Sequence, residues 1–261
     1  MRKILRVFAL LLLAVLAACP ATAQESRRGD VLYQVSTLEA LMTGVYDGQT
    51  TFAALAKHGD FGLGTFNALD GEMVALEGRF YQVRANGLIS LAAPSQLTPF
   101  ANVAFFRPQT RLVIENANDL AALQALLDKK LLSHNIFYAV RVTGLFSRVK
   151  VRSVPAQKPP YPPLTEVVKH QSVWNYNELN GTIVGFRFPP YMQGLNTTGY
   201  HLHFLDQDRQ KGGHLLDAAA AKLVVDVDSL HRLELALPRQ GAFLKARLGQ
   251  DTSQDVRKVE K

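Results

Sequence analysis

The sequence predicts an α/β protein of the α+β kind, with two strand-rich subdomains of mixed or antiparallel sheets and a few peripheral helices. Three observations predict this class. Short apolar runs are separated by turn dipeptides, a proline-rich run interrupts the chain once, and helix and strand patterns do not alternate regularly. The last observation argues against a doubly wound fold or a TIM barrel.

The first subdomain is expected to span residues 24–154 and to open with two short helices. Ser36-Thr37-Leu38-Glu39 matches a capping box for a helix through Met42, and Thr50–Lys57 is typical of a second helix ended by Gly59. Further along, Asn118 is expected to cap a helix that runs to about Leu132, because leucines and alanines recur there at helical spacing.

Strand patterns fill the rest of this subdomain. Turn dipeptides such as Asp70-Gly71 and Asn86-Gly87 separate four short runs and predict an antiparallel meander. Two further strands are expected after the long helix. The six expected strands are Phe61–Phe66, Glu72–Leu76, Phe80–Arg84, Leu88–Leu91, Ile136–Thr143 and Leu145–Val151.

Residues 155–163 contain five prolines and can join neither a helix nor a sheet interior. We expect them to link the first subdomain to a second one at 164–261, although a proline-rich ligand for another protein is an alternative. The strands expected in the second subdomain are Gly181–Phe188, Tyr200–Leu205, His214–Leu216, Leu223–Val227 and Leu233–Leu237.

Three histidines in the second subdomain predict a metal site on a hairpin. His201 and His203 lie on one face of an extended strand, and the polar, glycine-terminated segment after Leu205 suits a turn. If the hairpin is symmetric about Asp208 and Arg209, His203 lies opposite His214 and His201 is the diagonal neighbour. Three neutral nitrogens favour Zn²⁺ with one open position, although a solvated polar hairpin is the simpler alternative.

The N-terminus predicts export. Arg2, Lys3 and Arg6 precede an apolar run, and small residues follow it, so residues 1–23 form a signal peptide rather than a membrane span. Two processing sites compete: a lipobox-like pattern that would place lipid on Cys19, and cleavage after Ala23. The mature protein is then periplasmic or secreted, or a lipoprotein. Cys19 is the only cysteine, so no intramolecular disulfide can form.

The charge of the chain gives no indication of a nucleic-acid partner. The formal net charge is +7, and removal of residues 1–23 takes away three basic residues and no acidic ones, which leaves +4. Basic residues interleaved with aromatic ones are also missing from the sequence, so nucleic acid is not expected to bind.

Several ordered motifs from about Val31 onward resemble those of the alpha-acetolactate decarboxylases. They are Leu32-Tyr33-Gln34-Val35-Ser36-Thr37, Gly59-Asp60-Phe61-Gly62-Leu63-Gly64-Thr65, Leu69-Asp70-Gly71-Glu72-Met73, Phe80-Tyr81-Gln82, Thr98-Pro99-Phe100, Tyr161-Pro162-Pro163-Leu164-Thr165-Glu166 and Gly199-Tyr200-His201-Leu202-His203-Phe204. The resemblance implies a zinc enzyme of two sheet-containing subdomains that converts 2-acetolactate to acetoin and carbon dioxide. It also implies a homodimer.

The resemblance further implies roles for individual residues. It places the zinc ligands on the same three histidines, the catalytic glutamate on Glu72 and the active-site arginine on Arg152, and it adds Thr65 to the lining of the site. A glutamate of the C-terminal tail falls on Glu260 only after a shift of one residue. Taken alone, Glu72 and Arg152 would be interpreted as solvated residues.

The chemistry of the implied reaction explains these residue types. Loss of carbon dioxide from a β-keto acid moves negative charge onto the ketone oxygen, and zinc, as a Lewis acid, would stabilise the resulting enediolate. Arg152 would hold the substrate carboxylate, and Glu72 would deliver or relay a proton. Two alternatives stay open: a cupin-like metalloenzyme, with Asp206 or Gln207 in the region of a further ligand, and an exported metal-binding protein without catalytic activity.

Overall fold

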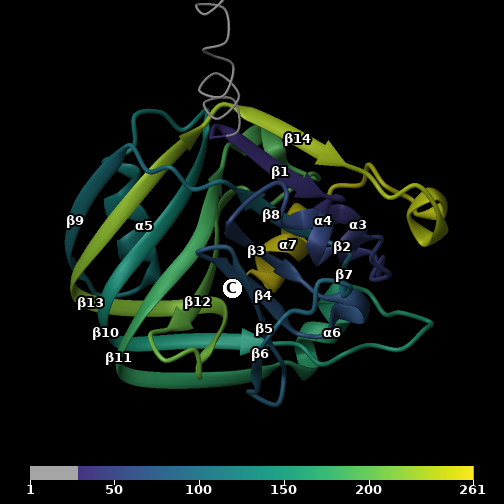
Figure 1. Cartoon of the computed structure of the whole chain (residues 1–261), viewed down its shortest axis with the longest axis horizontal. Helices are drawn as coiled ribbons and strands as arrows, with labels where there is room; N and C mark the ends of the chain where they lie inside the picture. Colours follow the sequence, from purple (N-terminus) through teal and green to yellow (C-terminus); the bar gives the residue numbers. More distant parts are fainter. Residues whose placement is uncertain (1–28, 261) are drawn as a thin grey trace, which may run out of the picture.

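The computed structural model describes residues 29–260. The expected signal peptide, Cys19 and both processing sites therefore lie outside the described residues. Figure 1 shows two sheets side by side, with a ring-like sheet on the left and a flatter one on the right. This mixture of sheets with few helices confirms the predicted fold class.

The flatter sheet has seven strands in the order β14-β1-β8-β3-β4-β5-β6. β1 runs parallel to β14, and the other neighbours are antiparallel. β3 to β6 form the predicted meander. Glu77 and Gly78 both have positive φ, 55° and 75°, as a tight two-residue hairpin turn requires. The strands are β1 (Val31–Val35), β3 (Phe61–Thr65), β4 (Glu72–Leu76), β5 (Arg79–Val83), β6 (Ile89–Leu91), β8 (Ala101–Ala104) and β14 (Arg232–Ala236).

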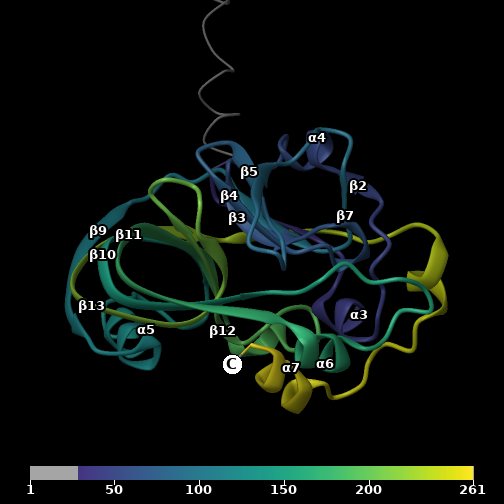
Figure 2. The same cartoon turned by 90° about the horizontal axis from the view of Figure 1, so that it is seen from below.

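The second sheet has five antiparallel strands in the order β10-β11-β12-β13-β9. β10 also pairs with β13, so β10 to β13 close into a ring around their own apolar core, as Figure 2 shows. Helix α5 (Leu120–Asp128) packs against β9 and β13. The strands are β9 (Thr110–Ala117), β10 (Phe137–Ser153), β11 (Ser172–Phe188), β12 (Gly199–Asp206) and β13 (Gly212–Leu230).

In two places, two neighbouring expected strands form one long strand, which corrects the sequence prediction. Ile136–Thr143 and Leu145–Val151 both belong to β10, which continues through Gly144. A Cβ atom on Gly144 would lie 2.9 Å from Leu223 Cδ2, so this glycine permits a close approach and does not end the strand. Similarly, His214–Leu216 and Leu223–Val227 both belong to β13, with an alanine-rich stretch between them.

The proline-rich segment does not separate the two sheets. β9 and β10 precede it and pair with strands that follow it, whereas β14 follows it and pairs with β1 at the N-terminal end of the described chain. The expected division into 24–154 and 164–261 therefore does not coincide with the sheets. The segment instead leads from β10 to helix α6 (Leu164–Val167).

The helices begin and end differently from the predictions. Thr37, not Ser36, caps α3 (Leu38–Met42), because its Oγ1 accepts a hydrogen bond from the Ala40 N–H at 3.1 Å. Asp119, not Asn118, caps α5 in the same way. The helix predicted over Thr50–Lys57 is shorter, because its first two residues form strand β2. The remaining short elements are β2 (Thr50–Thr51), α4 (Phe52–Leu55), β7 (Leu97–Thr98), η1 (Asn67–Leu69), η2 (Val168–His170), η3 (Pro190–Met192), η4 (Gly241–Lys245) and α7 (Ser253–Val259).

Helices α3, α6 and α7 gather beside one another at the bottom of the molecule in Figure 2. Their apolar residues form a common cluster that includes Leu38, Leu164 and Val259. Among residues 29–260, no helix has the length and apolar character needed to cross a membrane.

Candidate metal centre and active site

The hairpin of β12 and β13 brings the three histidines together. His203 pairs with His214 in the strand register, as the symmetric turn predicts, and His201 lies two residues away on the same face. Each pair of ring centroids is 5.2 Å apart, and one nitrogen from each ring lies within 4.8 Å of the other two. The three side chains can therefore bind one metal ion.

Local interactions fix this hairpin. Asp206 Oδ1 accepts hydrogen bonds from the N–H groups of Gln210 and Lys211 at 2.7 and 2.9 Å, which closes the turn. On the opposite face of β12, Leu202 and Phe204 pack into the core of the ring. Asp206, considered above as a further ligand in a cupin-like site, thus has a structural place in the turn.

Burial keeps the three imidazoles neutral. Desolvation, followed by the nearby charge of Arg152, lowers the pKa of His201 to about 3. Desolvation also places the pKa values of His203 and His214 well below the usual range. His203 Nδ1 lies 2.8 Å from the carbonyl oxygen of Met73, so Nδ1 donates to it and Nε2 presents its lone pair to the site.

Glu72 begins strand β4 and is 6% exposed. Its Oε2 lies 3.6 Å from His203 Nε2, and its Oε1 accepts a hydrogen bond from Arg152 Nη1 at 2.9 Å. Desolvation raises the pKa of Glu72 to about 7, although the charge of Arg152 opposes this change. Near neutral pH this carboxyl group can therefore hold or release a proton.

Arg152 comes from β10, directly opposite His214 in the register, and is also buried. In addition to Glu72 it donates from Nη2 to the carbonyl oxygen of Val259 at 3.2 Å. Its Nε has no partner among the described residues.

Glu260 follows helix α7 and lies beside His201 and His214. Its Oε2 lies 3.9 Å from His201 Nε2 and 3.8 Å from His214 Nε2. Burial raises the pKa of Glu260 to about 7, against the lowering effect of Arg152. The structure therefore brings this residue to the site despite its displaced position in the sequence pattern.

Thr65 also lines the site, but its hydroxyl donates to the carbonyl oxygen of Gly71 at 2.7 Å. Gly71 has a φ of 86° and immediately precedes Glu72. The hydrogen bond therefore holds the turn that orients Glu72, and Thr65 is paired with Glu72 in the β3–β4 register.

An apolar wall that was not predicted from the sequence completes the site. The wall surrounds a closed cavity of about 30 Å³, which has room for about two water molecules. No sequence signal singles out these residues, because they come from segments far apart in the chain and look like ordinary core positions. They are Leu38, Leu41, Leu69, Phe100, Val154, Leu164 and Val259.

The chain is similar to proteins of one family. The model of the family described as alpha-acetolactate decarboxylase matches residues 32–250. The chain is 48% identical to the alpha-acetolactate decarboxylase of Methylococcus capsulatus over 88% of each chain, and 44% identical to that of Klebsiella aerogenes over 88% and 91%. The solved structure of the Bacillus subtilis alpha-acetolactate decarboxylase has a TM-score of 0.86 at 38% identity and covers 88% of this chain and 99% of its own.

Proposed function

The chain belongs to the alpha-acetolactate decarboxylase family, and we propose that it converts 2-acetolactate to acetoin and carbon dioxide at a zinc ion held by His201, His203 and His214. The observation that carries this proposal is the convergence of three neutral histidines with a buried arginine and two carboxyl groups in one cavity. This combination suits the decarboxylation of a β-keto acid.

The residues fit a zinc ion. Three neutral imidazoles leave its positive charge uncompensated and leave a coordination position for a ligand, as is typical of catalytic sites. When bound, the ion supplies Lewis-acid stabilisation of the negative charge that moves onto the ketone oxygen as carbon dioxide leaves. The hydrogen bond from His203 Nδ1 to Met73 holds that ring in the orientation a ligand needs.

Arg152 orients the substrate. Its free Nε–H supports a role as donor to the substrate carboxylate, and its position beside the histidines aligns the bond to be broken with the ketone. Burial strengthens this contact, because water does not compete for the guanidinium.

Glu72 supplies the proton that replaces carbon dioxide on the substrate carbon. A pKa raised to about 7 lets this carboxyl group donate a proton near neutral pH, and its hydrogen bond to Arg152 fixes its position beside the bound carboxylate. The apolar wall around Leu41, Phe100 and Leu164 is chemically suited to contact the two methyl groups of 2-acetolactate once the substrate is bound. Proton delivery from one fixed side sets the configuration of acetoin.

One experiment tests the proposed function. The metal-loaded protein is expected to form acetoin from racemic 2-acetolactate, a chelator should abolish the activity, and zinc should restore it. His214→Ala should remove both bound zinc and activity, whereas His231→Ala, at an exposed position, should change neither. A zinc-loaded protein that forms no acetoin would support a metal-binding role without catalysis.

We also propose that the protein is exported and forms a homodimer. Residues 1–23 support export by their basic start and apolar run, and family membership supports the dimer. Intact mass of the protein from the producing cells distinguishes cleavage after Ala23 from lipid on Cys19. Sedimentation of the purified protein measures its oligomeric state.

A further inference from the structure

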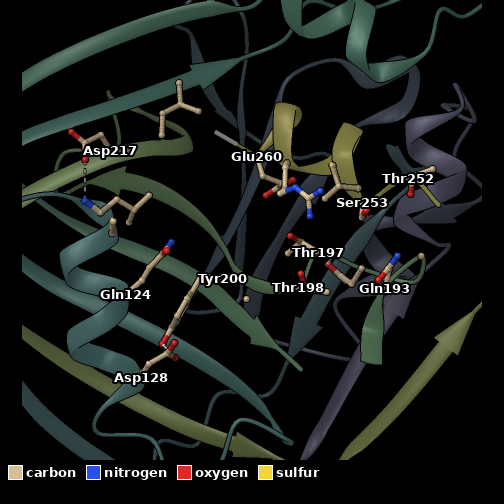
Figure 3. A pocket seen from close by; sticks show the side chains of 18 of the residues that line it. Gln124, Asp128, Gln193, Thr197, Thr198, Tyr200, Asp217, Thr252, Ser253 and Glu260 are labelled. Carbon is tan, nitrogen blue, oxygen red and sulfur yellow. Dashed lines mark hydrogen bonds between the residues drawn. The ribbon is translucent and has the colours of Figure 1, made fainter. Parts of the chain in front are cut away.

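A second, larger cavity lies directly outside the active site. It has a volume of about 700 Å³ and is bounded by α5, by residues 193–200 and by the C-terminal residues 251–260. Figure 3 shows Tyr200 and Asp128 on one side of it and Glu260 on the other. Glu260 is the only described residue that lines both this cavity and the closed one at the histidines. The side chain of Glu260 therefore lies between the larger cavity and the cavity at the histidines.

The closed cavity cannot hold the substrate. Its volume of about 30 Å³ accommodates about two water molecules, whereas sites for small organic ligands measure about 300 Å³ or more. A five-carbon keto acid therefore reaches the histidines only if part of the wall moves. Seven of its fifteen lining residues lie on strands β3, β4, β10, β12 and β13, which are paired on both sides. The other eight come from short helices and connecting segments, including α7 and the residue after it.

The C-terminal segment is a part of the wall that no strand pairing holds. It follows Gly249, whose φ of 93° suits a glycine at a change of chain direction. Two hydrogen bonds fix its start: the Gln250 N–H donates to Glu39 Oε1 at 2.7 Å, and Gln193 Nε2 donates to Asp251 Oδ1 at 3.0 Å.

The distal end of the segment is held mainly by apolar contact. Val256 and Val259 of α7 pack against the cluster that contains Leu38 and Leu164. From the site, Arg152 Nη2 donates a hydrogen bond to the Val259 carbonyl oxygen, and His214 contacts the backbone of Glu260. No strand pairing involves the segment, so it can separate without opening either sheet.

We propose that α7 and Glu260 form a lid, and that the 700 Å³ cavity is the entrance chamber through which the substrate reaches the metal centre. Opening moves Val259 and Glu260 away from Arg152 and the histidines and joins the two cavities. Closing excludes water from the substrate and returns Glu260 to the histidines. This inference rests on the proposed function for the identity of the substrate, but not for the motion itself.

A cysteine reporter tests the lid without measuring activity. Val154 lines the closed cavity and is 2% exposed, so Val154→Cys, made together with Cys19→Ser, places a single thiol behind the lid. Its alkylation by iodoacetamide should be slow in the folded protein, yet faster than global unfolding measured on the same variant. Amide exchange at Val256 and Glu260 should likewise be faster than at buried positions of β10.

Matched variants of α7 identify the moving part. Val256→Ala removes apolar contact with the cluster that contains Leu38 and Leu164. About two methylene groups of buried surface are lost, so the lid should open more often and alkylation should become about fivefold to tenfold faster. Lys258→Ala changes an exposed side chain of the same helix, paired only with Asp255, and should leave the rate within about twofold. Thermal unfolding of each variant verifies that it is folded.

The outcomes distinguish the lid from the proposed function. Equal alkylation rates in the Val256→Ala and Lys258→Ala backgrounds, or alkylation only at the rate of global unfolding, would overturn the lid even in an active enzyme. Conversely, a lid-dependent rate in a zinc-loaded protein that forms no acetoin would support the lid and overturn the decarboxylase assignment.

Discussion

Arg152 Nη1 donates to Glu72 Oε1 at 2.9 Å, and both side chains are less than a tenth exposed. The two residues come from different sheets, β10 and β4, so this buried ion pair joins the sheets at the active site. Each partner compensates the charge of the other in a buried region. Removal of one partner therefore affects both the chemistry and the stability of the protein.

Glu72→Gln should lower the turnover of 2-acetolactate by about 100-fold or more, because the amide cannot act as the proton donor that we propose the carboxyl group to be. Bound zinc should stay at the wild-type level, since the three histidines are unchanged. Enzyme kinetics and metal analysis of the purified variant measure both. Glu166→Gln, an exposed carboxylate, serves as the control. Loss of zinc from the Glu72 variant would show that Glu72 is a ligand instead.

Arg152→Gln should lower the free energy of unfolding by about 3–5 kcal/mol, the usual effect of leaving one partner of a buried ion pair alone. Urea unfolding measures this difference. The smaller loss expected for Arg148→Gln, whose pair with Asp217 is partly exposed, provides the comparison. If the two variants were equally stable, the buried pair would contribute no more than a surface pair.

The metal-free protein should lose stability as the pH falls below 6.5. The histidine pKa values are lowered on folding, so the histidines contribute fully to the free energy of unfolding above pH 6.5. This contribution is lost at lower pH, as the unfolded chain takes up protons. Glu72 and Glu260 act with the opposite sign: their pKa values are raised from 4.5 to about 7, so the folded protein takes up protons first. Because three histidines outweigh two carboxyl groups, the free energy of unfolding should still fall between pH 6.5 and 4.5, and it should fall more steeply below pH 4.5.

Urea unfolding of the metal-free protein at several pH values checks this balance. In the double variant Glu72→Gln and Glu260→Gln, the free energy of unfolding should fall more steeply between pH 6.5 and 4.5. The reason is that the folded protein no longer takes up protons at the two carboxyl groups. A free energy of unfolding that stays constant over this range in the unmodified protein would contradict the expected protonation of the histidines.

Gly185→Ala should destabilise the protein by about 1–3 kcal/mol and weaken zinc binding. A Cβ atom at this position would lie 2.2 Å from the carbonyl oxygen of His201 and 2.7 Å from Leu202 Cδ2, so β11 and β12 must move apart at the site. Urea unfolding and zinc titration measure the two effects. Gly29→Ala, where the nearest atom is 3.7 Å away, should be neutral. A Gly185 variant with unchanged zinc affinity would show that His201 tolerates this shift.

The sequence predicted the histidine cluster because its geometry is local. The turn between His203 and His214 is symmetric, so counting residues from its centre was sufficient to give the register. The prediction of Glu72, Arg152 and Glu260 came from the resemblance to a family, since each is contributed by a distant element. No pattern within the chain brings them together.

The missed strands have physical causes. The stretch from Asp217 to Lys222 is rich in alanine, which favours helices, but its first half pairs with β10 and its second half with β9, and this pairing holds it in β13. The first half of β11 was not predicted, although Trp174, Tyr176 and Leu179 face the core and the residues between them are polar. That alternation was a usable signal. The pairing of β1 with β14 in one sheet was not predictable from local patterns, because about 200 residues separate Val31 from its partner Arg232 along the chain.

The hydrogen bond from His203 to the Met73 carbonyl has a consequence for how the protein matures. It connects a proposed metal ligand, carried by the ring of strands, to the backbone of the other sheet. A fully formed metal site therefore requires that both sheets have already docked, and an ion that arrives earlier meets an incomplete site. Uptake of zinc during refolding would report the docking of the two sheets, and chelation would weaken their association.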